Sequence, residues 1–107
     1  MVERLRALLR WREYLGPLRK ALKEAFPGCK AFIVGSAPKG RLTALSDIDV
    51  LIVCNKKLTL MEFAKKTAMV REELEREGIE WSFLFEFHFV TEDRLKDVLE
   101  EPYVRLI

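Results

Sequence analysis

The sequence is poor in amide, thiol and imidazole side chains: it has no glutamine, one asparagine, two cysteines and one histidine. Scarce Gln and Asn beside abundant Glu, Lys and Arg is a bias reported for proteins that work at high temperature. Cys29 and Cys54 lie at the ends of apolar runs. We therefore expect two small core residues, neither a disulfide framework nor a metal site, and a reducing compartment.

Long apolar runs are also missing. No stretch approaches the roughly 20 residues needed to cross a bilayer. Residues 1–10, MVERLRALLR, lack the long apolar centre and the cleavage site of a signal peptide. These absences predict a cytoplasmic protein with no membrane partner.

A strong charge of one sign is absent as well, because the net charge is only +2. Such a value does not indicate broad attraction to nucleic acid or to anionic lipid. The basic residues that crowd the first quarter are best interpreted as the solvated face of a helix, with a nucleic-acid or partner surface as the alternative. A chain of 107 residues, half of them apolar, is typical of one folded domain, here residues 1–107.

Apolar residues recur at helical spacing through residues 2–26 and are interrupted at Gly16-Pro17. Proline is tolerated only in the first turn of a helix, so this segment predicts a kinked helix or two successive helices. Residues 29–34 and 47–54 are short apolar runs rich in β-branched residues. Both predict buried strands.

The second half of the chain predicts a helix, a strand and a last helix. Thr59 and Glu62 have the spacing of a capping box, and apolar residues follow at helical period as far as Gly78. Residues 81–90 alternate phenylalanine with other side chains, which predicts a strand with one apolar face. A final helix capped by Thr91 would end at Pro102, and the apolar residues 103–107 are expected to dock on this domain or on a partner.

The motif SDIDV places Asp47 and Asp49 on one face of a strand, about 6.5 Å apart along the chain. Aspartate is disfavoured inside strands, and adjacent carboxylates repel each other unless cations are present. Two divalent metals about 3.5–4 Å apart would relieve this repulsion and clamp a phosphate that undergoes in-line displacement. Magnesium is the expected ion for oxygen ligands and phosphates.

The loop before this strand supplies complementary groups. Gly35-Ser36 follows directly on the first predicted strand, where glycine lets the backbone approach a ligand and exposed N–H groups can face phosphate oxygens. Lys39 could add a positive charge. Taken alone, a Gly-Ser pair is an ordinary turn. The Gly-Ser pair indicates a function only together with the Asp-x-Asp motif, from which ten residues separate it.

The segment VGSAPKGRLTALSDIDVLIV, residues 34–53, resembles the signature of the DNA polymerase beta-type nucleotidyltransferase superfamily. It is most similar to the small prokaryotic branch, the minimal nucleotidyltransferases. The resemblance implies an α+β fold, with a short mixed β-sheet and helices packed on one face, like the polymerase beta palm. The order of predicted elements is similar to that family over most of the chain.

The resemblance also implies roles for individual residues. Gly35 and Ser36, with help from Lys39, would bind the triphosphate of ATP. In this family a third carboxylate comes from a later strand, and Glu86 is the candidate because it lies between apolar residues in FEFHFVTEDRL. The family more often has Asp there, and Glu80 is the alternative.

The roles of two further residues, His88 and Arg41, are left undecided by the sequence. His88 would either contact substrate or be an ordinary half-exposed strand histidine. Arg41 stands where many members of the family have an acid.

The function implied is metal-dependent transfer of a nucleoside monophosphate, AMP from ATP, to an acceptor hydroxyl, with two Mg²⁺ ions held by Asp47, Asp49 and Glu86. Members of this branch often act as antitoxins, some by adding AMP to a tyrosine of a small helical partner of the HEPN type. The alternative is a non-catalytic nucleotide-binding module, an antitoxin or regulator that acts through protein–protein contact. A homo-oligomer is compatible with either.

Overall fold

The computed structural model describes residues 2–107 and contains four α-helices, four strands and three short 3₁₀ turns. In chain order the helices are α1 (Val2–Leu9), α2 (Leu15–Ala25), α3 (Leu60–Arg76) and α4 (Leu95–Val98). The strands are β1 (Lys30–Val34), β2 (Ile48–Cys54), β3 (Phe85–Thr91) and β4 (Val104–Arg105). The 3₁₀ turns are Trp11–Tyr14, Ser82–Leu84 and Glu92–Arg94.

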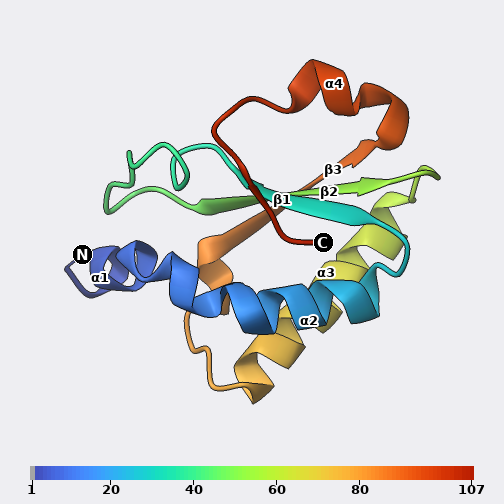
Figure 1. Cartoon of the computed structure of the whole chain (residues 1–107). Coiled ribbons are helices and arrows are strands. Elements are labelled where there is room, and N and C mark those ends of the chain that lie inside the picture. Colours follow the sequence, from blue (N-terminus) through green and yellow to red (C-terminus); the bar gives the residue numbers. More distant parts are fainter. Residues whose placement is uncertain (1) are drawn as a thin grey trace.

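The strands form one mixed sheet in the order β3-β2-β1-β4. β2 and β3 are parallel and are joined by the crossover that contains α3, whereas β1 runs antiparallel to both β2 and β4. Helices α2 and α3 lie against one face of this sheet (Figure 1). A short mixed sheet with its main helices on one face is the α+β architecture predicted from the sequence.

Side chains alternate between the two faces of the sheet. On β2, Ile48, Val50 and Ile52 enter the main core beneath α2 and α3, together with buried residues of both helices. The intervening residues Leu51 and Val53 point to the opposite face. Asp49 shares that opposite face by the same alternation. The candidate site therefore lies on the side of the sheet that α2 and α3 leave uncovered.

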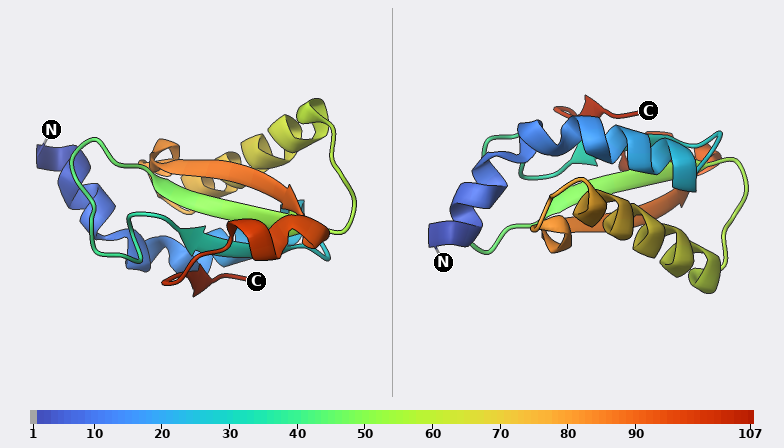
Figure 2. Two further views of the ribbon diagram at one scale, coloured as in Figure 1. Left: turned by 90° about the horizontal axis from the view of Figure 1, so that it is seen from above. Right: turned by 90° about the horizontal axis from the view of Figure 1, so that it is seen from below.

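Part of the opposite face is covered by the segment around α4, which was not expected there. Leu95 and Leu99 pack against a small cluster formed by Phe32, Leu51 and Val53. The two views in Figure 2 show α2 and α3 over one face and α4 over the other. This cover lies toward the C-terminal ends of β2 and β3. The N-terminal ends, which carry the acidic side chains, lie beyond it.

Three predicted boundaries differ from the structure for reasons of packing. The N-terminal helices are separated by the 3₁₀ turn Trp11–Tyr14 and not at Gly16-Pro17, because the i, i+3 spacing turns both Trp11 and Tyr14 into the core. Pro17 instead lies in the first turn of α2, where proline is tolerated. The last helix is much shorter than predicted, since Leu99 is extended and packs on the sheet, and Thr91 makes no side-chain cap.

The third strand begins at Phe85, four residues later than predicted. Residues 82–84 form a 3₁₀ turn instead, and Phe83 is exposed. The guanidinium of Arg71 on α3 donates to the carbonyl oxygens of Ser82 at 2.7 Å and Phe85 at 2.9 Å. This contact ties the turn to α3 and fixes the point at which β3 starts.

The two cysteines form a disulfide, so the expectation of two unlinked core thiols was wrong. The β1–β2 register pairs Lys30 with Val53, which puts Cys29 opposite Cys54 one step beyond the strand pairing. Their Cα atoms are 4.5 Å apart, a separation that a disulfide can span. Sequence spacing of 25 residues does not reveal this pairing, because it depends on the strand register.

Other predictions for the second half are confirmed. Thr59 and Glu62 form the reciprocal capping box at the start of α3. Gly78 follows α3 with a φ of +86°, the left-handed conformation common after a helix. The apolar tail docks on the domain, since Val104 pairs with Ile33 and Leu106 is buried. None of the described helices has the length and apolar character to cross a membrane.

Candidate functional site

Asp49 and Glu86 lie side by side because of the strand register. In the parallel pairing of β2 with β3, residue 49 stands opposite residue 86. Neighbouring strands are about 4.8 Å apart, so two side chains at paired positions on one face come within contact range. The tie between Arg71 and Phe85, described above, holds the strand at the residue before Glu86. Burial lowers the pKa of Arg71, but a guanidinium stays charged at neutral pH.

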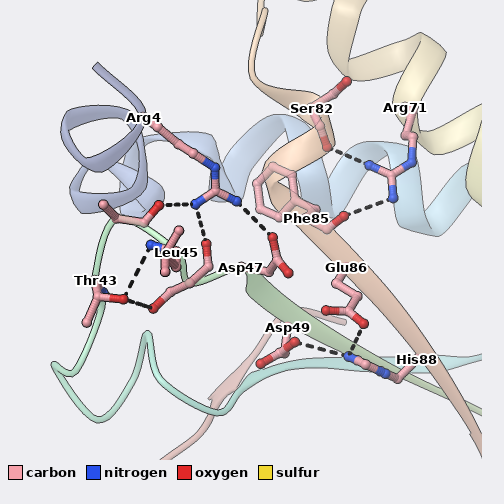
Figure 3. A network of polar contacts seen from close by, with 12 residues as sticks. Arg4, Thr43, Leu45, Asp47, Asp49, Arg71, Ser82, Phe85, Glu86 and His88 are labelled. Atoms are coloured by element: carbon pink, nitrogen blue, oxygen red, sulfur yellow. Dashed lines mark hydrogen bonds and ion pairs between the residues drawn. The ribbon is translucent and has the colours of Figure 1, made fainter. Parts of the chain in front are cut away.

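His88 joins this pair from the next position on the same face of β3. Its Nε2 lies 3.0 Å from Asp49 Oδ1 and 3.9 Å from Glu86 Oε1. One ligand atom from each of these three residues can be chosen so that all lie within 4.8 Å of one another (Figure 3). Two carboxylates and an imidazole are a set of metal-binding donors, so the chemistry of the residues fits a divalent ion.

Gly35 passes close to the Asp49 carboxylate. Val34 is paired with Asp49, and the chain turns away at Gly35 with a φ of +76°. A Cβ atom at residue 35 would lie 2.5 Å from Asp49 Oδ2. Only glycine both adopts this backbone conformation without strain and leaves that space open beside the carboxylate.

Asp47 lies just before β2 and is turned toward α1. Arg4 donates from its Nη2 to Asp47 Oδ1 at 3.0 Å, and from Nη1 to the carbonyl oxygens of Ala44 and Ser46. Figure 3 shows Asp47 facing Arg4 while Asp49 and Glu86 face His88. The Asp-x-Asp motif is therefore divided between an arginine partner and the cluster with His88.

The Arg4 contact could not be foreseen from the sequence. Arg4 is one of several arginines at helical spacing near the N-terminus, and nothing local distinguishes it from the others. Its role depends on the position of α1 against the loop before β2. His88 was recognised as a possible substrate contact, and the structure adds its short distance to Asp49.

The predicted phosphate loop forms a tight turn over residues 35–40. The carbonyl oxygen of Ser36 accepts from Arg41 N at 3.0 Å, which closes the turn. Lys39 is exposed and its Nζ lies 4.0 Å from Glu100 Oε2, so it is directed toward the C-terminal segment. Glu80 precedes the 3₁₀ turn and lies outside β3.

The site is open to solvent. The side chains of Asp47, Asp49 and Glu86 are 41%, 29% and 54% exposed. Asp49 and Glu86 bring two carboxylates together, whereas Asp47 is paired with Arg4. The negative charge on Asp49 and Glu86 would attract a divalent cation.

Comparison with known proteins gives one family and one fold. The model of a family described as a nucleotidyltransferase domain matches residues 15–105. The crystal structure of a candidate nucleotidyltransferase from Sulfolobus solfataricus is similar with a TM-score of 0.55 and 20% sequence identity, over 95% of this chain and 84% of that chain. At this identity the likeness concerns the fold. No curated protein matches the chain in sequence.

Proposed function

Because the chain belongs to the nucleotidyltransferase domain family and is a transferase, we propose that residues 1–107 act as one minimal domain that transfers AMP from ATP to an acceptor hydroxyl. The observation that carries this proposal is the close approach of Asp49 both to Glu86 and to Gly35. Two carboxylates on paired strands thus lie beside a turn in which Gly35 has no side chain to fill the space next to Asp49. A single core beneath the sheet links residues from both ends of the chain.

The turn after β1 is the proposed site of the triphosphate. Gly35 has no side chain to obstruct a phosphate, and Ser36 adds a hydroxyl and a backbone N–H. Lys39 lies in the same turn on a flexible side chain, and its 4.0 Å contact with Glu100 is weak enough to exchange for a phosphate oxygen.

Asp47, Asp49 and Glu86 are proposed to hold two Mg²⁺ ions, with Asp47 leaving Arg4 when an ion binds. Bound Mg²⁺ would neutralise charge on the phosphates as the α–β phosphoanhydride bond breaks and pyrophosphate departs. The carboxylate of Glu86, at the exposed edge of the cluster, would accept the proton of the attacking hydroxyl. Ser36 and Gly35 would keep the leaving group in line.

The acceptor we propose is a tyrosine hydroxyl of a small helical protein of the HEPN type, which this chain would then control as an antitoxin. Support for a protein acceptor comes from the open site, where a protruding side chain can reach Glu86. An exposed leucine, Leu45, lies in the loop before Asp47 and is 80% exposed. It offers an apolar contact for a partner at the edge of the site.

The test incubates the chain with α-labelled ATP, Mg²⁺ and the protein encoded by the neighbouring gene. We expect label on the partner with the wild type and at least about a 10³-fold lower rate with Asp47→Asn/Asp49→Asn, since transfer needs the ions those residues hold. The double substitution Asp93→Asn/Asp97→Asn is the matched control. It removes the same charge from exposed positions in and beside α4.

Two results would contradict this proposal. If the Asp93→Asn/Asp97→Asn control lost transfer as severely as Asp47→Asn/Asp49→Asn, the loss would come from the change in the net charge of the chain and not from the site. If the Asp47→Asn/Asp49→Asn chain rescued the partner's toxicity as well as the wild type, without label on either sample, the chain would act by contact. Replacing Glu86 and Glu80 separately by Gln assigns the third carboxylate, and we expect only Glu86→Gln to lose transfer.

A further inference from the structure

We propose that Asp49, Glu86 and His88 form one of the two ion positions of the proposed site, and that this mixed oxygen and nitrogen position prefers a divalent first-row transition ion, such as Mn²⁺, Co²⁺ or Zn²⁺, to the Mg²⁺ named above. This inference deepens the proposed function, on which it rests for the role of the ion in the transfer reaction. It adds a ligand, His88, that the Asp-x-Asp motif does not contain.

The distances suit ligands of a single ion. Two ligands with bonds of about 2.1 Å are about 3.0 Å apart at a right angle and about 3.4 Å apart at a tetrahedral angle. His88 Nε2 lies 3.0 Å from Asp49 Oδ1 and 3.9 Å from Glu86 Oε1. The first separation needs no adjustment, and a small rotation of the exposed Glu86 side chain shortens the second.

The backbone keeps the rest of the site accessible. The space beside Asp49 Oδ2 would be filled by a side chain at residue 35, and Gly35 leaves it open. Asp47 is bound to Arg4 and is not needed for this set of three ligands. An ion bound between Asp49 and His88 would take the place of the present 3.0 Å contact between Nε2 and Oδ1.

The imidazole determines the selectivity. Mg²⁺ prefers oxygen ligands in regular octahedral geometry and keeps several waters. A neutral imidazole binds later first-row ions much better, and their affinity for such sites rises from Mn²⁺ through Co²⁺. Two carboxylates alone would favour Mg²⁺ or Ca²⁺, whereas the addition of His88 shifts the preference toward transition ions.

The test uses the untagged chain, because His88 is its only histidine. Co²⁺ is titrated while the imidazole resonances are followed by NMR, and Co²⁺ and Mg²⁺ affinities are measured by calorimetry without nucleotide. The variant His88→Gln keeps a side-chain N–H for Asp49 but is a poor ligand for Co²⁺. We expect it to weaken Co²⁺ binding at least about 10-fold and Mg²⁺ binding less than about 2-fold.

Glu86→Gln is the contrasting variant, since loss of a carboxylate weakens both ions. The inference is overturned if Co²⁺ leaves the His88 resonances unmoved, or if His88→Gln weakens both ions equally, as a residue that merely positions Asp49 would. The NMR titration of the wild type needs no variant to fold. Co²⁺ binding at His88 without any AMP transfer would contradict the proposed function alone, and transfer without Co²⁺ at His88 would contradict this inference alone.

Discussion

Replacing Gly35 by alanine tests whether the close passage of the loop sets the position of Asp49. The new Cβ would lie 2.5 Å from Asp49 Oδ2, whereas ordinary contact begins at 3.4 Å, so the carboxylate must withdraw by about 0.9 Å. The left-handed backbone adds about 1–2 kcal/mol of strain for any residue with a side chain. A displacement of about 1 Å at a reacting centre can cost about 10²-fold in rate.

Gly28→Ala separates these two effects. Gly28 has a φ of +81°, and no atom lies within 4 Å of the position that a methyl group would take there, so this variant carries the backbone strain without the collision. It also lies seven residues from Gly35, roughly 23 Å along an extended chain. We expect both variants to lose about 1–2 kcal/mol of unfolding free energy in urea. Only Gly35→Ala should lose about 10²-fold of the transfer rate.

The assays are urea denaturation for stability, and labelled AMP transfer with Mg²⁺-ATP calorimetry for function. A wild-type transfer rate in Gly35→Ala would refute the reasoning, since the collision at Asp49 would then have no consequence. So would an equal fall in both variants, which would reduce the effect to backbone strain.

Three further predictions concern stability. Reduction of the Cys29–Cys54 disulfide, or its replacement by two serines, should cost about 3.5 kcal/mol for a separation of 25 residues. Calorimetry should show a Tm lowered by roughly 15 °C, and an unchanged Tm would contradict the prediction. Arg4→Gln should lower the free energy of unfolding in urea by about 1–2 kcal/mol, because Arg4 donates to two carbonyl oxygens. A double-mutant cycle with Asp47→Asn should give a coupling energy below about 1 kcal/mol, since the ion pair is partly exposed. A larger coupling energy would show that the ion pair dominates. The backbone N–H of Thr59 holds the pKa of Glu62 below its usual 4.5. The ionised Glu62 carboxylate therefore stabilises the folded state above that pH, and this stabilisation is lost as the pH falls through the lowered pKa. The stability difference between wild type and Glu62→Gln should therefore shrink below pH 4.5, and a constant difference from pH 7 to pH 3 would disprove the assignment.

The elements that the sequence predicted best are those whose local signals agree with their packing. The capping box of Thr59 and Glu62 and the stop at Gly78 are short-range features, and both occur as predicted. The strands at residues 29–34 and 47–54 were within one residue of their observed bounds. Apolar runs bounded by turn residues specify buried strands without help from distant contacts.

What the sequence could not predict depends on contacts between distant residues. The start of β3 is set by Arg71, from another element, rather than by the alternation of phenylalanines. The disulfide follows from the register of β1 on β2, and the partner of Asp47 follows from where α1 packs. Tertiary contacts override local preference in each case.

The candidate site also contains features that the sequence predicted and features that depend on contacts between distant residues. Asp47 and Asp49 were expected together on one face of a strand from its period of two. Asp49 lies on the face opposite the main core, whereas Asp47 precedes β2 and faces Arg4. That Glu86 stands opposite it, and that His88 comes within 3.0 Å, required the parallel pairing of β2 with β3. The roles assigned to Gly35, Ser36, Lys39, Asp47, Asp49 and Glu86 remain predictions for the experiments above.

The parallel ladder between β2 and β3 has a consequence for how this chain can vary. The ladder aligns Asp49 with Glu86 through backbone hydrogen bonds, while the connection between the two strands, residues 55–84, only has to return to the sheet and keep the contacts of Arg71 that fix the start of β3. Insertions and deletions elsewhere in that connection leave the acid pair together. One extra residue between Phe85 and Glu86 would instead turn Glu86 into the apolar core, so natural length variation should accumulate in the crossover and avoid the strand.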